Sequence, residues 1–202
     1  MRIPKHIGII PDGNRRWAKE KGLNKEEGYD YGLDPGLQLL KLAKEYGIEE
    51  ITYYGFTVDN CKRPKEQIKA FQQACVDAIS MIAKEDVSLL VMGKTDSKFF
   101  PKELIPYTKT DRSKSKKGQI KVNFLVNYGW DWDLKNGLQS KEISRIDMII
   151  RWGGMRRLSG FLPVQSVYAD FFIVDELWPD FSPKQFKDAI FWYQNQDVTL
   201  GG

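Results

Sequence analysis

The residues best suited to chemistry stand in three polar clusters, and the first of them is Pro11–Arg16. It reads Pro-Asp-Gly-Asn-Arg-Arg and directly follows an apolar run that starts at His6. Asp12 supplies a carboxylate, Gly13 a flexible backbone, and a helix expected to start at Arg15 supplies main-chain N–H groups. A carboxylate next to such amides suits an anion that is bound together with a metal ion.

The other two clusters are rich in arginine. Asn60–Pro64 contains Arg63 and lies between an expected strand and an expected helix, while Arg151–Ser159 combines two glycines with three guanidinium groups. The planar guanidinium matches phosphate oxygens in a bidentate manner. Two or three arginines from separate segments suit a diphosphate better than an isolated carboxylate, so the pattern favours a diphosphate ligand.

Charge alone leaves three interpretations open. The net charge is +4, from 31 basic and 27 acidic residues, and basic residues gather in residues 1–25, 102–121 and 151–160. Such clusters could form a stripe for nucleic acid, a phosphate site assembled from distant segments, or solvated surface. We expect no nucleic-acid partner, because the basic residues cluster with acids and glycines instead of along one helix face.

Other reaction classes lack their residues. His6 is the only histidine and opens an apolar run, so a Ser-His-Asp triad would have to use a residue with a structural role. The sequence has no Walker A motif, no dinucleotide-binding glycine fingerprint and no two-histidine zinc motif. Its two cysteines, Cys61 and Cys75, are too few for a cysteine zinc site, and we expect them to be reduced thiols.

Alternating strands and helices are expected to position the clusters. Apolar runs predict buried strands over residues 6–11, 51–57, 87–92, 122–127 and 146–150. Helical spacing and capping residues predict helices over residues 15–22, 34–47, 64–84 and 182–196, with an irregular connection over residues 94–120. This alternation predicts an α/β fold with a central, mostly parallel sheet flanked by helices. Such sheets bind ligands at the carboxyl ends of their strands, where the three clusters fall.

Length and composition fit one cytoplasmic domain. The chain has 202 residues, of which 42% are hydrophobic and 29% charged, so it can bury a sizeable core as a single domain over residues 1–202. Its longest stretch without a charged residue, Leu158–Ala169, has twelve residues. A membrane span needs about 20. The N-terminus does not resemble a secretory signal, so we expect a cytoplasmic protein without a transmembrane helix.

Four motifs, in order, resemble those of the cis-prenyltransferases, the undecaprenyl and dehydrodolichyl diphosphate synthase family. They are HIGIIPDGNRRWAKEKG at residues 6–22, YGFTVDNCKRPKEQ at 54–67, VNYGW at 126–130 and RWGGMRRLSGFLPVQSVYADFFIVDELWPDF at 151–181. The resemblance covers essentially the whole chain. It implies the family's fold, which is a parallel sheet with an apolar tunnel for a hydrocarbon chain, and it implies a homodimer.

The resemblance also implies a reaction. An allylic prenyl diphosphate condenses with isopentenyl diphosphate in the presence of Mg²⁺, and the product is a longer diphosphate with a new cis double bond. The allylic diphosphate ionises when its C–O bond breaks, and cations on the departing diphosphate favour this step. Because such products are apolar, peripheral contact with a membrane is expected without a dedicated anchor.

Site residues are implied at the positions that match the family's motifs. Asp12 would hold the metal and assist departure of the allylic diphosphate, and Asp170 would help to hold the metal, either within the chain or across a dimer interface. Asn60 and Thr57 would form a polar pair near the reacting carbons and count as catalytic together with Asp12. The diphosphate of the second substrate would be bound by Arg151, Arg157 and Ser159. The remaining substrate-binding positions are Gly13, Asn14, Arg15, Arg16, Trp17, Lys25, Tyr29 and Arg63.

Several positions depart from the family pattern. Tyr29 replaces a histidine, Lys25 an arginine, Cys61 a tryptophan and Met155 a glutamate, and the stretch over residues 128–150 is short. These departures leave the product length open and keep two alternatives. One is head-to-middle coupling of two allylic diphosphates such as dimethylallyl diphosphate, as in lavandulyl-type synthases. The other is a role as one subunit of a heteromeric enzyme.

Overall fold

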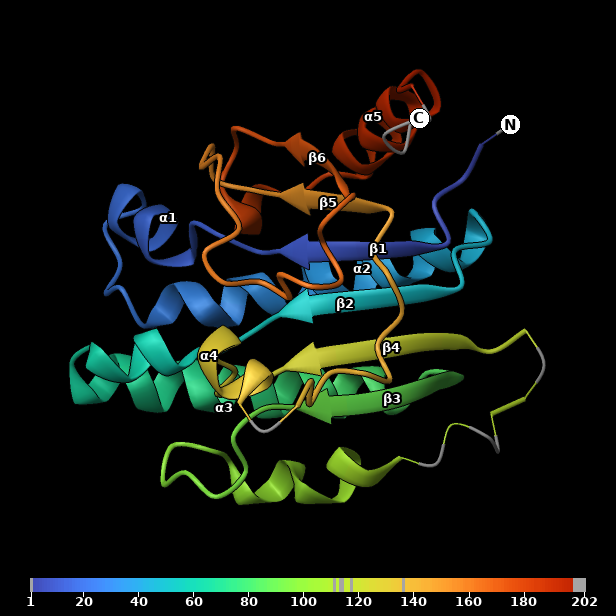
Figure 1. Cartoon of the computed structure of the whole chain (residues 1–202). Helices are drawn as coiled ribbons and strands as arrows, with labels where there is room; N and C mark the ends of the chain where they lie inside the picture. The colour runs from blue at the N-terminus through green and yellow to red at the C-terminus, as the bar shows by residue number, and fades with distance from the viewer. Residues whose placement is uncertain (1, 111, 113–114, 117, 136, 198–202) are drawn as a thin grey trace.

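Six parallel strands form one sheet in the computed structural model of the chain. The structure describes residues 2–110, 112, 115–116, 118–135 and 137–197. Across the sheet the strands follow the order β3, β4, β2, β1, β5, β6, and every neighbouring pair is parallel (Figure 1). Their bounds are β1 His6–Ile10, β2 Glu50–Tyr54, β3 Val87–Met92, β4 Ile120–Leu125, β5 Met148–Arg151 and β6 Asp170–Ile173.

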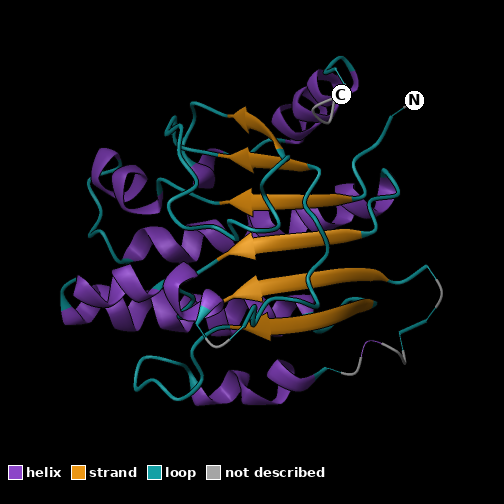
Figure 2. Cartoon of the chain, viewed as in Figure 1, coloured by secondary structure: helices purple, strands orange, loops and turns teal. Residues whose placement is uncertain are grey.

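Three of the helices cover one face of the sheet (Figure 2). These are α2 Leu33–Glu45, α3 Lys65–Ile82 and α5 Pro183–Gln194, whose buried apolar side chains share one core cluster with the isoleucines of β1 and β2. The shorter α1 Asn14–Glu20 and α4 Trp130–Leu134 follow β1 and β4. Turns of 3₁₀ helix occupy Glu27–Gly32, Val58–Lys62, Lys102–Lys109 and Trp178–Asp180. The helical layer on this face is typical of a parallel sheet, which needs apolar cover.

The opposite face is covered mainly by the connections that follow β4 and β5. Ile146, Phe161 and Leu162 pack there against Ile10 at the end of β1. Gly8 makes this close approach possible, because a Cβ at that position would lie 2.5 Å from the Phe161 ring. The loop after β5 therefore lies directly on the sheet, next to the carboxyl end of β1.

The predicted α/β fold class is confirmed, and most element boundaries agree closely. The four predicted helices begin and end within two residues of their observed bounds. One strand prediction fails at its end: the strand predicted over residues 51–57 stops at Tyr54. Thr57 instead forms a single bridge to Tyr128 and caps the following 3₁₀ helix with its side chain.

The sequence also failed to predict some regular structure, including the short helix α4. The edge strand β6 was not predicted, because its four residues are only half-buried and give no apolar periodicity. The segment predicted to be irregular contains the 3₁₀ helix Lys102–Lys109, which packs beside β3. Within the described part of the chain, no helix is long and apolar enough to cross a membrane.

Candidate active site

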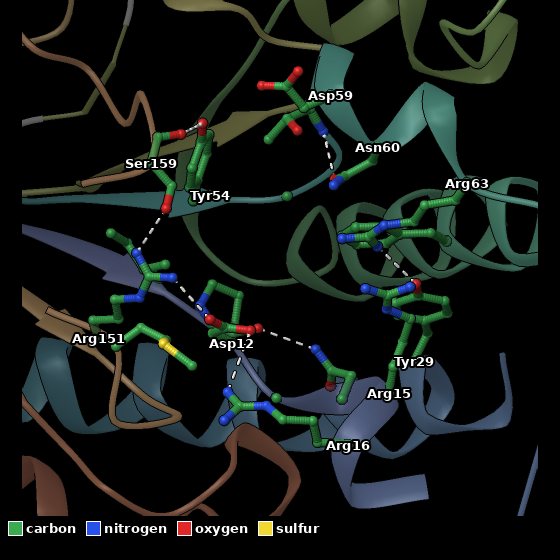
Figure 3. A pocket seen from close by; sticks show the side chains of 18 of the residues that line it. Asp12, Arg15, Arg16, Tyr29, Tyr54, Asp59, Asn60, Arg63, Arg151 and Ser159 are labelled. Carbon is green, nitrogen blue, oxygen red and sulfur yellow. Dashed lines mark hydrogen bonds and ion pairs between the residues drawn. The ribbon is translucent and has the colours of Figure 1, made fainter. Parts of the chain in front are cut away.

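A cleft of about 400 Å³ lies at the carboxyl ends of the central strands (Figure 3). The last residues of β1, β2 and β5 reach it as Ile10, Tyr54 and Arg151. The loops that follow these strands carry the three polar clusters into the same space. This is the edge at which parallel α/β sheets bind their ligands.

The Arg151 guanidinium and the Asp12 carboxylate form the centre of the cleft. Arg151 donates through Nη2 to Asp12 Oδ2 at 2.8 Å, and through Nη1 to Ser159 Oγ at 3.0 Å and to the Arg157 carbonyl. The Arg151 side chain is only 4% exposed, whereas that of Asp12 is 34% exposed. The guanidinium is therefore held in one orientation, while the carboxylate still faces the open cleft.

Arg16 ties the first helix to the loop after β5. Its Nη2 donates to the Gly153 carbonyl at 2.9 Å and lies 3.7 Å from Asp12 Oδ1. Gly153 has φ +84°, and a Cβ there would overlap the Arg16 guanidinium. The positive φ favours glycine at this position, and a side chain here would displace the end of the Arg16 side chain from its observed place.

Tyr54 fixes the opposite side of the same loop. Its hydroxyl donates to the Ser159 carbonyl at 2.7 Å, and burial raises the pKa of the phenol well above its usual value. Ser159 itself has φ +52°, a left-handed conformation that is uncommon for a residue with a side chain. Bonds from Tyr54 and Arg151 hold this turn in place.

A second pair of arginines lies across the cleft. Arg15 donates to Gln67 Oε1 at 2.9 Å, and Arg63 donates to the Tyr29 hydroxyl at 2.8 Å. Burial lowers the pKa of Arg63 and raises that of Tyr29, so Tyr29 is a neutral acceptor for the Arg63 cation. The Tyr29 ring stacks on Phe71, with centroids 4.5 Å apart and the planes tilted by 5°.

Thr57 and Asn60 form a capping box on the rim of the cleft. The Thr57 main-chain N–H donates to Asn60 Oδ1 at 3.0 Å, and the Thr57 side chain accepts from the main chain of residue 60. This reciprocal pair fixes the direction of the loop after β2. The loop also carries Asp59, which lines the cleft.

The cleft is strongly cationic. Its lining contains five arginines and only two carboxylates, which are Arg15, Arg16, Arg63, Arg151 and Arg157 against Asp12 and Asp59. Guanidinium groups in a confined space favour ligands with several anionic oxygens. The described residues contain no group of three or more histidine, cysteine or acidic side chains that could cage a metal by themselves. A cation here would bind Asp12 together with oxygens of the ligand.

The structure brings together twelve of the fifteen predicted site residues. All twelve line the cleft: Asp12, Gly13, Asn14, Arg15, Arg16, Tyr29, Thr57, Asn60, Arg63, Arg151, Arg157 and Ser159. The clustering agrees with the prediction that polar segments following the strands meet at one edge of the sheet.

Trp17, Lys25 and Asp170 do not line the cleft. The Trp17 indole is turned away to donate to Asp180 Oδ1 at 2.8 Å, and Lys25 is exposed in the turn after α1. Asp170 begins β6, in register with Met148 at the amino end of β5. Three residues of strand, about 10 Å, separate that end of the sheet from the level of Arg151. Within one chain Asp170 pairs with Arg2 at 3.5 Å and is not brought to Asp12.

Sequence reasoning missed Tyr54, Asp59 and Phe71 as lining residues. Tyr54 ends the observed strand β2, but the strand was predicted to continue to Thr57, so the predicted carboxyl end did not indicate Tyr54. Phe71 lies on α3, where its side chain packs against the core and also lines the cleft. Apolar periodicity cannot distinguish a core residue from one that lines an apolar cavity.

The parallel sheet and the cationic cleft at its carboxyl edge define an α/β protein whose cleft suits a polyanionic ligand. The family model described as putative undecaprenyl diphosphate synthase matches residues 10–141 and 134–201. The chain belongs to this family of prenyl diphosphate synthases. The predicted family and the predicted class of enzyme, a transferase of prenyl groups, are thereby confirmed.

Two curated relatives illustrate the similarity. The ditrans,polycis-undecaprenyl-diphosphate synthase of Pasteurella multocida, specific for (2E,6E)-farnesyl diphosphate, is 30% identical over 230 positions that cover 99% of this chain and 95% of the relative. The isoprenyl transferase of Thermotoga maritima is 30% identical and covered over 98% of its length. These alignments are longer than the 202 residues of this chain, as expected for a chain that lacks segments present in its relatives.

A solved structure shares the fold. The crystal structure of lavandulyl diphosphate synthase from Lavandula x intermedia, in complex with dimethylallyl diphosphate, superposes with a TM-score of 0.81 over 99% of both chains. Its sequence identity to this chain is 21%. The similarity confirms the arrangement of the sheet and its covering layers.

Proposed function

We propose that this chain condenses an allylic prenyl diphosphate with isopentenyl diphosphate to form a cis-prenyl diphosphate. The observation that carries the proposal is the fixed Arg151–Asp12 pair, surrounded by further arginines at the carboxyl edge of the sheet. A diphosphate with its metal ion suits this arrangement of cations around one exposed carboxylate.

The arginines act on the departing diphosphate. In the proposed reaction the allylic C–O bond breaks, the diphosphate takes the electron pair, and the double bond of isopentenyl diphosphate forms the new C–C bond with loss of a proton. Negative charge grows on the departing oxygens, and oriented cations stabilise it most where they need no reorganisation. Arg16 and Arg151 are held in this way by Gly153 and Ser159.

Mg²⁺ fits the residues around Asp12. The Asp12 carboxylate faces the cleft, and Mg²⁺ commonly binds one or two protein carboxylates together with phosphate oxygens and water. The bound ion would supply positive charge to the departing diphosphate. Asp12 would hold the ion. The allylic diphosphate would be bound by Arg16, Gly13 and Asn14, and the second diphosphate by Arg151, Arg157 and Ser159.

The test is incorporation of labelled isopentenyl diphosphate by the purified full-length chain. We expect incorporation that requires an allylic diphosphate and Mg²⁺ and stops when the metal is chelated. Absence of incorporation with every allylic diphosphate from five to fifteen carbons, by a chain shown to be folded, would reject the proposed function.

Head-to-middle coupling remains the second candidate because of Met155. This residue lines the cleft in the loop that also carries Arg157, at the position where the family resemblance places a glutamate. Dimethylallyl diphosphate alone distinguishes the two reactions. A coupled product formed without isopentenyl diphosphate would favour the head-to-middle reaction.

The assembly is also a proposal. A homodimer is implied by the sequence resemblance, and Asp170 on the edge strand β6 would contribute to a neighbouring site only in such an assembly. Light scattering on the purified chain, alone and after the Asp170→Asn change, would report its oligomeric state. A monomeric chain with full activity would exclude a shared site.

A further inference from the structure

The short helix α4 lies next to the cleft without lining it. It follows β4 and sits at the carboxyl ends of β2 and β4 (Figure 1). The structure describes all five of its residues, and none of them lines the cleft. Its first residue, Trp130, is 52% exposed, although tryptophan side chains are highly buried on average. Neither the core nor the cleft lining therefore accounts for the position of this indole.

A buried carboxylate anchors the far end of α4. Asp133 is 1% exposed and accepts hydrogen bonds from the Tyr128 hydroxyl at 2.5 Å and from the Ser140 main-chain N–H and hydroxyl, both at 2.7 Å. Buried polar networks whose members are bonded in this way are rigid. Just before the helix, the Tyr128 carbonyl accepts from the Val58 N–H at 2.9 Å. The helix is thus a fixed support that is also tied to the loop after β2.

The Trp130 indole packs against the turn at Ser159 and Gly160. A Cβ at Gly160 would lie 2.8 Å from Trp130 Cδ1 and 3.5 Å from the Tyr54 hydroxyl, so both side chains border this glycine. Tyr54 lines the cleft, and its hydroxyl donates to the Ser159 carbonyl (Figure 3). Trp130 does not line the cleft, so it contacts the same turn from outside.

The turn has a backbone conformation that needs support. Ser159 has φ +52° and Gly160 has φ +81°, so two consecutive residues are left-handed. A side chain makes this conformation costly, and it persists only where surrounding contacts enforce it. From the cleft, Arg151 bonds to the Ser159 hydroxyl and Tyr54 to the Ser159 carbonyl. The packing of Trp130 on Gly160 adds a contact on the outside of the turn.

We infer that Trp130 is a positioning residue that clamps the Ser159–Gly160 turn and thereby strengthens binding of the second diphosphate. Ser159 is proposed to bind this group, and Arg151 connects the turn to Arg157 by donating to both residues. The apparent dissociation constant rises as the fraction of molecules with a formed turn falls, so the clamp acts on affinity. This inference rests on the proposed function, because it takes Ser159 to bind the diphosphate of the second substrate.

Calorimetric titration of the full-length chain with isopentenyl diphosphate and Mg²⁺ tests the clamp without turnover, because no allylic substrate is present. We expect Trp130→Ala to weaken binding about five- to tenfold, as for a turn that is formed in only a minority of molecules. Trp130→Phe keeps a ring beside Gly160 and should retain most of the affinity. The matched control is Leu134→Ala, which removes another exposed apolar side chain of α4 and should leave the affinity unchanged. Equal affinities of Trp130→Ala and this control would overturn the inference.

The allylic site provides a comparison that a general loss of structure would not satisfy. Its proposed ligands Gly13, Asn14 and Arg16 lie in the loop after β1 and in α1. We therefore expect Trp130→Ala to leave the affinity for a non-ionisable allylic S-thiolodiphosphate unchanged. In steady-state assays KM for isopentenyl diphosphate should rise, with kcat nearly constant. Equal losses of affinity for both ligands would contradict a clamp on this turn.

Hydrogen exchange measures the turn itself, without a ligand. The Phe161 N–H closes the turn by donating to the Leu158 carbonyl at 3.1 Å. Trp130→Ala should speed exchange of this amide at least about fivefold, as for a locally opened segment, and leave the amides of β1 unchanged. Unchanged exchange at Phe161 would overturn the inference. Failure of the original chain to bind isopentenyl diphosphate would instead reject the proposed function, and the exchange result alone would then decide whether Trp130 clamps the turn.

Discussion

Asp12 and Arg151 show how one side chain can be fixed while its partner stays available to a ligand. Arg151 is buried and makes three hydrogen bonds, so its position is set before any ligand arrives. The Asp12 carboxylate contacts Arg151 and Arg16, and its oxygens can still bind a ligand or a cation in the cleft. Removing the carboxylate entirely would leave a buried cation without its partner, which is costly in itself. An amide substitution is therefore the cleaner test of chemistry.

Asp12→Asn is expected to abolish most prenyl transfer with little change in folding. The amide oxygen can still accept from Arg151, but it carries no charge for a cation beside the diphosphate. We expect kcat to fall by a factor of about 10²–10³, as for other groups that stabilise developing charge. The measurement is a steady-state assay with the thermal midpoint recorded in parallel.

The matched control is Asp188→Asn, which removes a carboxylate from the exposed Lys184 ion pair on α5. Its activity should equal that of the original chain. An Asp12→Asn variant with an unchanged rate would remove Asp12 from the mechanism.

Tyr54→Phe tests the support beneath the loop after β5. The change removes one hydrogen bond to the Ser159 carbonyl, and we expect a loss of about 0.5–1.5 kcal/mol in the free energy of unfolding. Because Ser159 and Arg157 are proposed to bind the second diphosphate, KM for isopentenyl diphosphate should rise several-fold with kcat nearly constant. Urea unfolding and initial-rate kinetics measure the two effects, and a fall confined to kcat would argue against this role.

At the scale of elements, the sequence predicts the strands other than β6, the α-helices other than α4, and the edge at which the site lies. Long apolar runs and clear caps account for this success, as at Ser182 and Pro183 before α5. Tertiary contacts decide which predicted site residues reach the cleft of their own chain. Asp170 does not reach it, because pairing with β5 places this residue at the amino end of β6. The side-chain contacts of Trp17 also depend on a distant partner, Asp180.

The substitution Gly153→Ala tests the contact between Arg16 of α1 and the loop after β5. The methyl group would overlap the Arg16 guanidinium, and the positive φ of 84° adds backbone strain. We expect loss of most activity, because Arg16 can no longer reach the Gly153 carbonyl. Gly22→Ala is the control, since Gly22 also has a positive φ but nothing within 4 Å of its added Cβ.

Both variants should lose about 1–2 kcal/mol of stability from backbone strain. Only Gly153→Ala should lose activity beyond that explained by unfolding. Equal activity of the two variants would show that the Arg16 position does not matter for turnover. Chemical denaturation and rate measurements under the same buffer conditions provide the comparison.

At the scale of the whole molecule, a buried polar network crosses the sheet far from the cleft. His6 Nε2 lies 2.8 Å from Thr52 Oγ1, and Asn123 bridges Thr52 to Glu50, with Arg112 at 3.5 Å from the Glu50 carboxylate. Burial lowers the pKa of His6 despite the nearby carboxylates. Burial alone would raise the pKa of Glu50, but the charges of His6 and Arg112 and the hydrogen bond from Asn123 lower it on balance.

Both shifts predict that the fold is destabilised by acid. As pH falls through the usual imidazole pKa of about 6.5, the unfolded chain binds a proton at His6 that the folded chain resists. Below the usual carboxyl pKa of about 4.3, the unfolded chain likewise protonates Glu50 first. The thermal midpoint of unfolding should therefore fall between pH 7 and pH 4. In the His6→Gln variant, the midpoint should depend less on pH between pH 7 and 5. A midpoint that rises on acidification would contradict this assignment.

The mass of the product tests the central claim most directly. Allylic diphosphates of five, ten and fifteen carbons are each incubated with isopentenyl diphosphate, Mg²⁺ and the full-length chain, with Asp12→Asn in parallel, and the diphosphates are analysed by mass spectrometry. The predicted result is a new diphosphate that is heavier than one of these allylic substrates by one or more five-carbon units and is strongly reduced in the Asp12→Asn reaction. A folded chain that leaves every substrate unchanged, or forms the same product in equal amount without the Asp12 carboxylate, would contradict the proposed function.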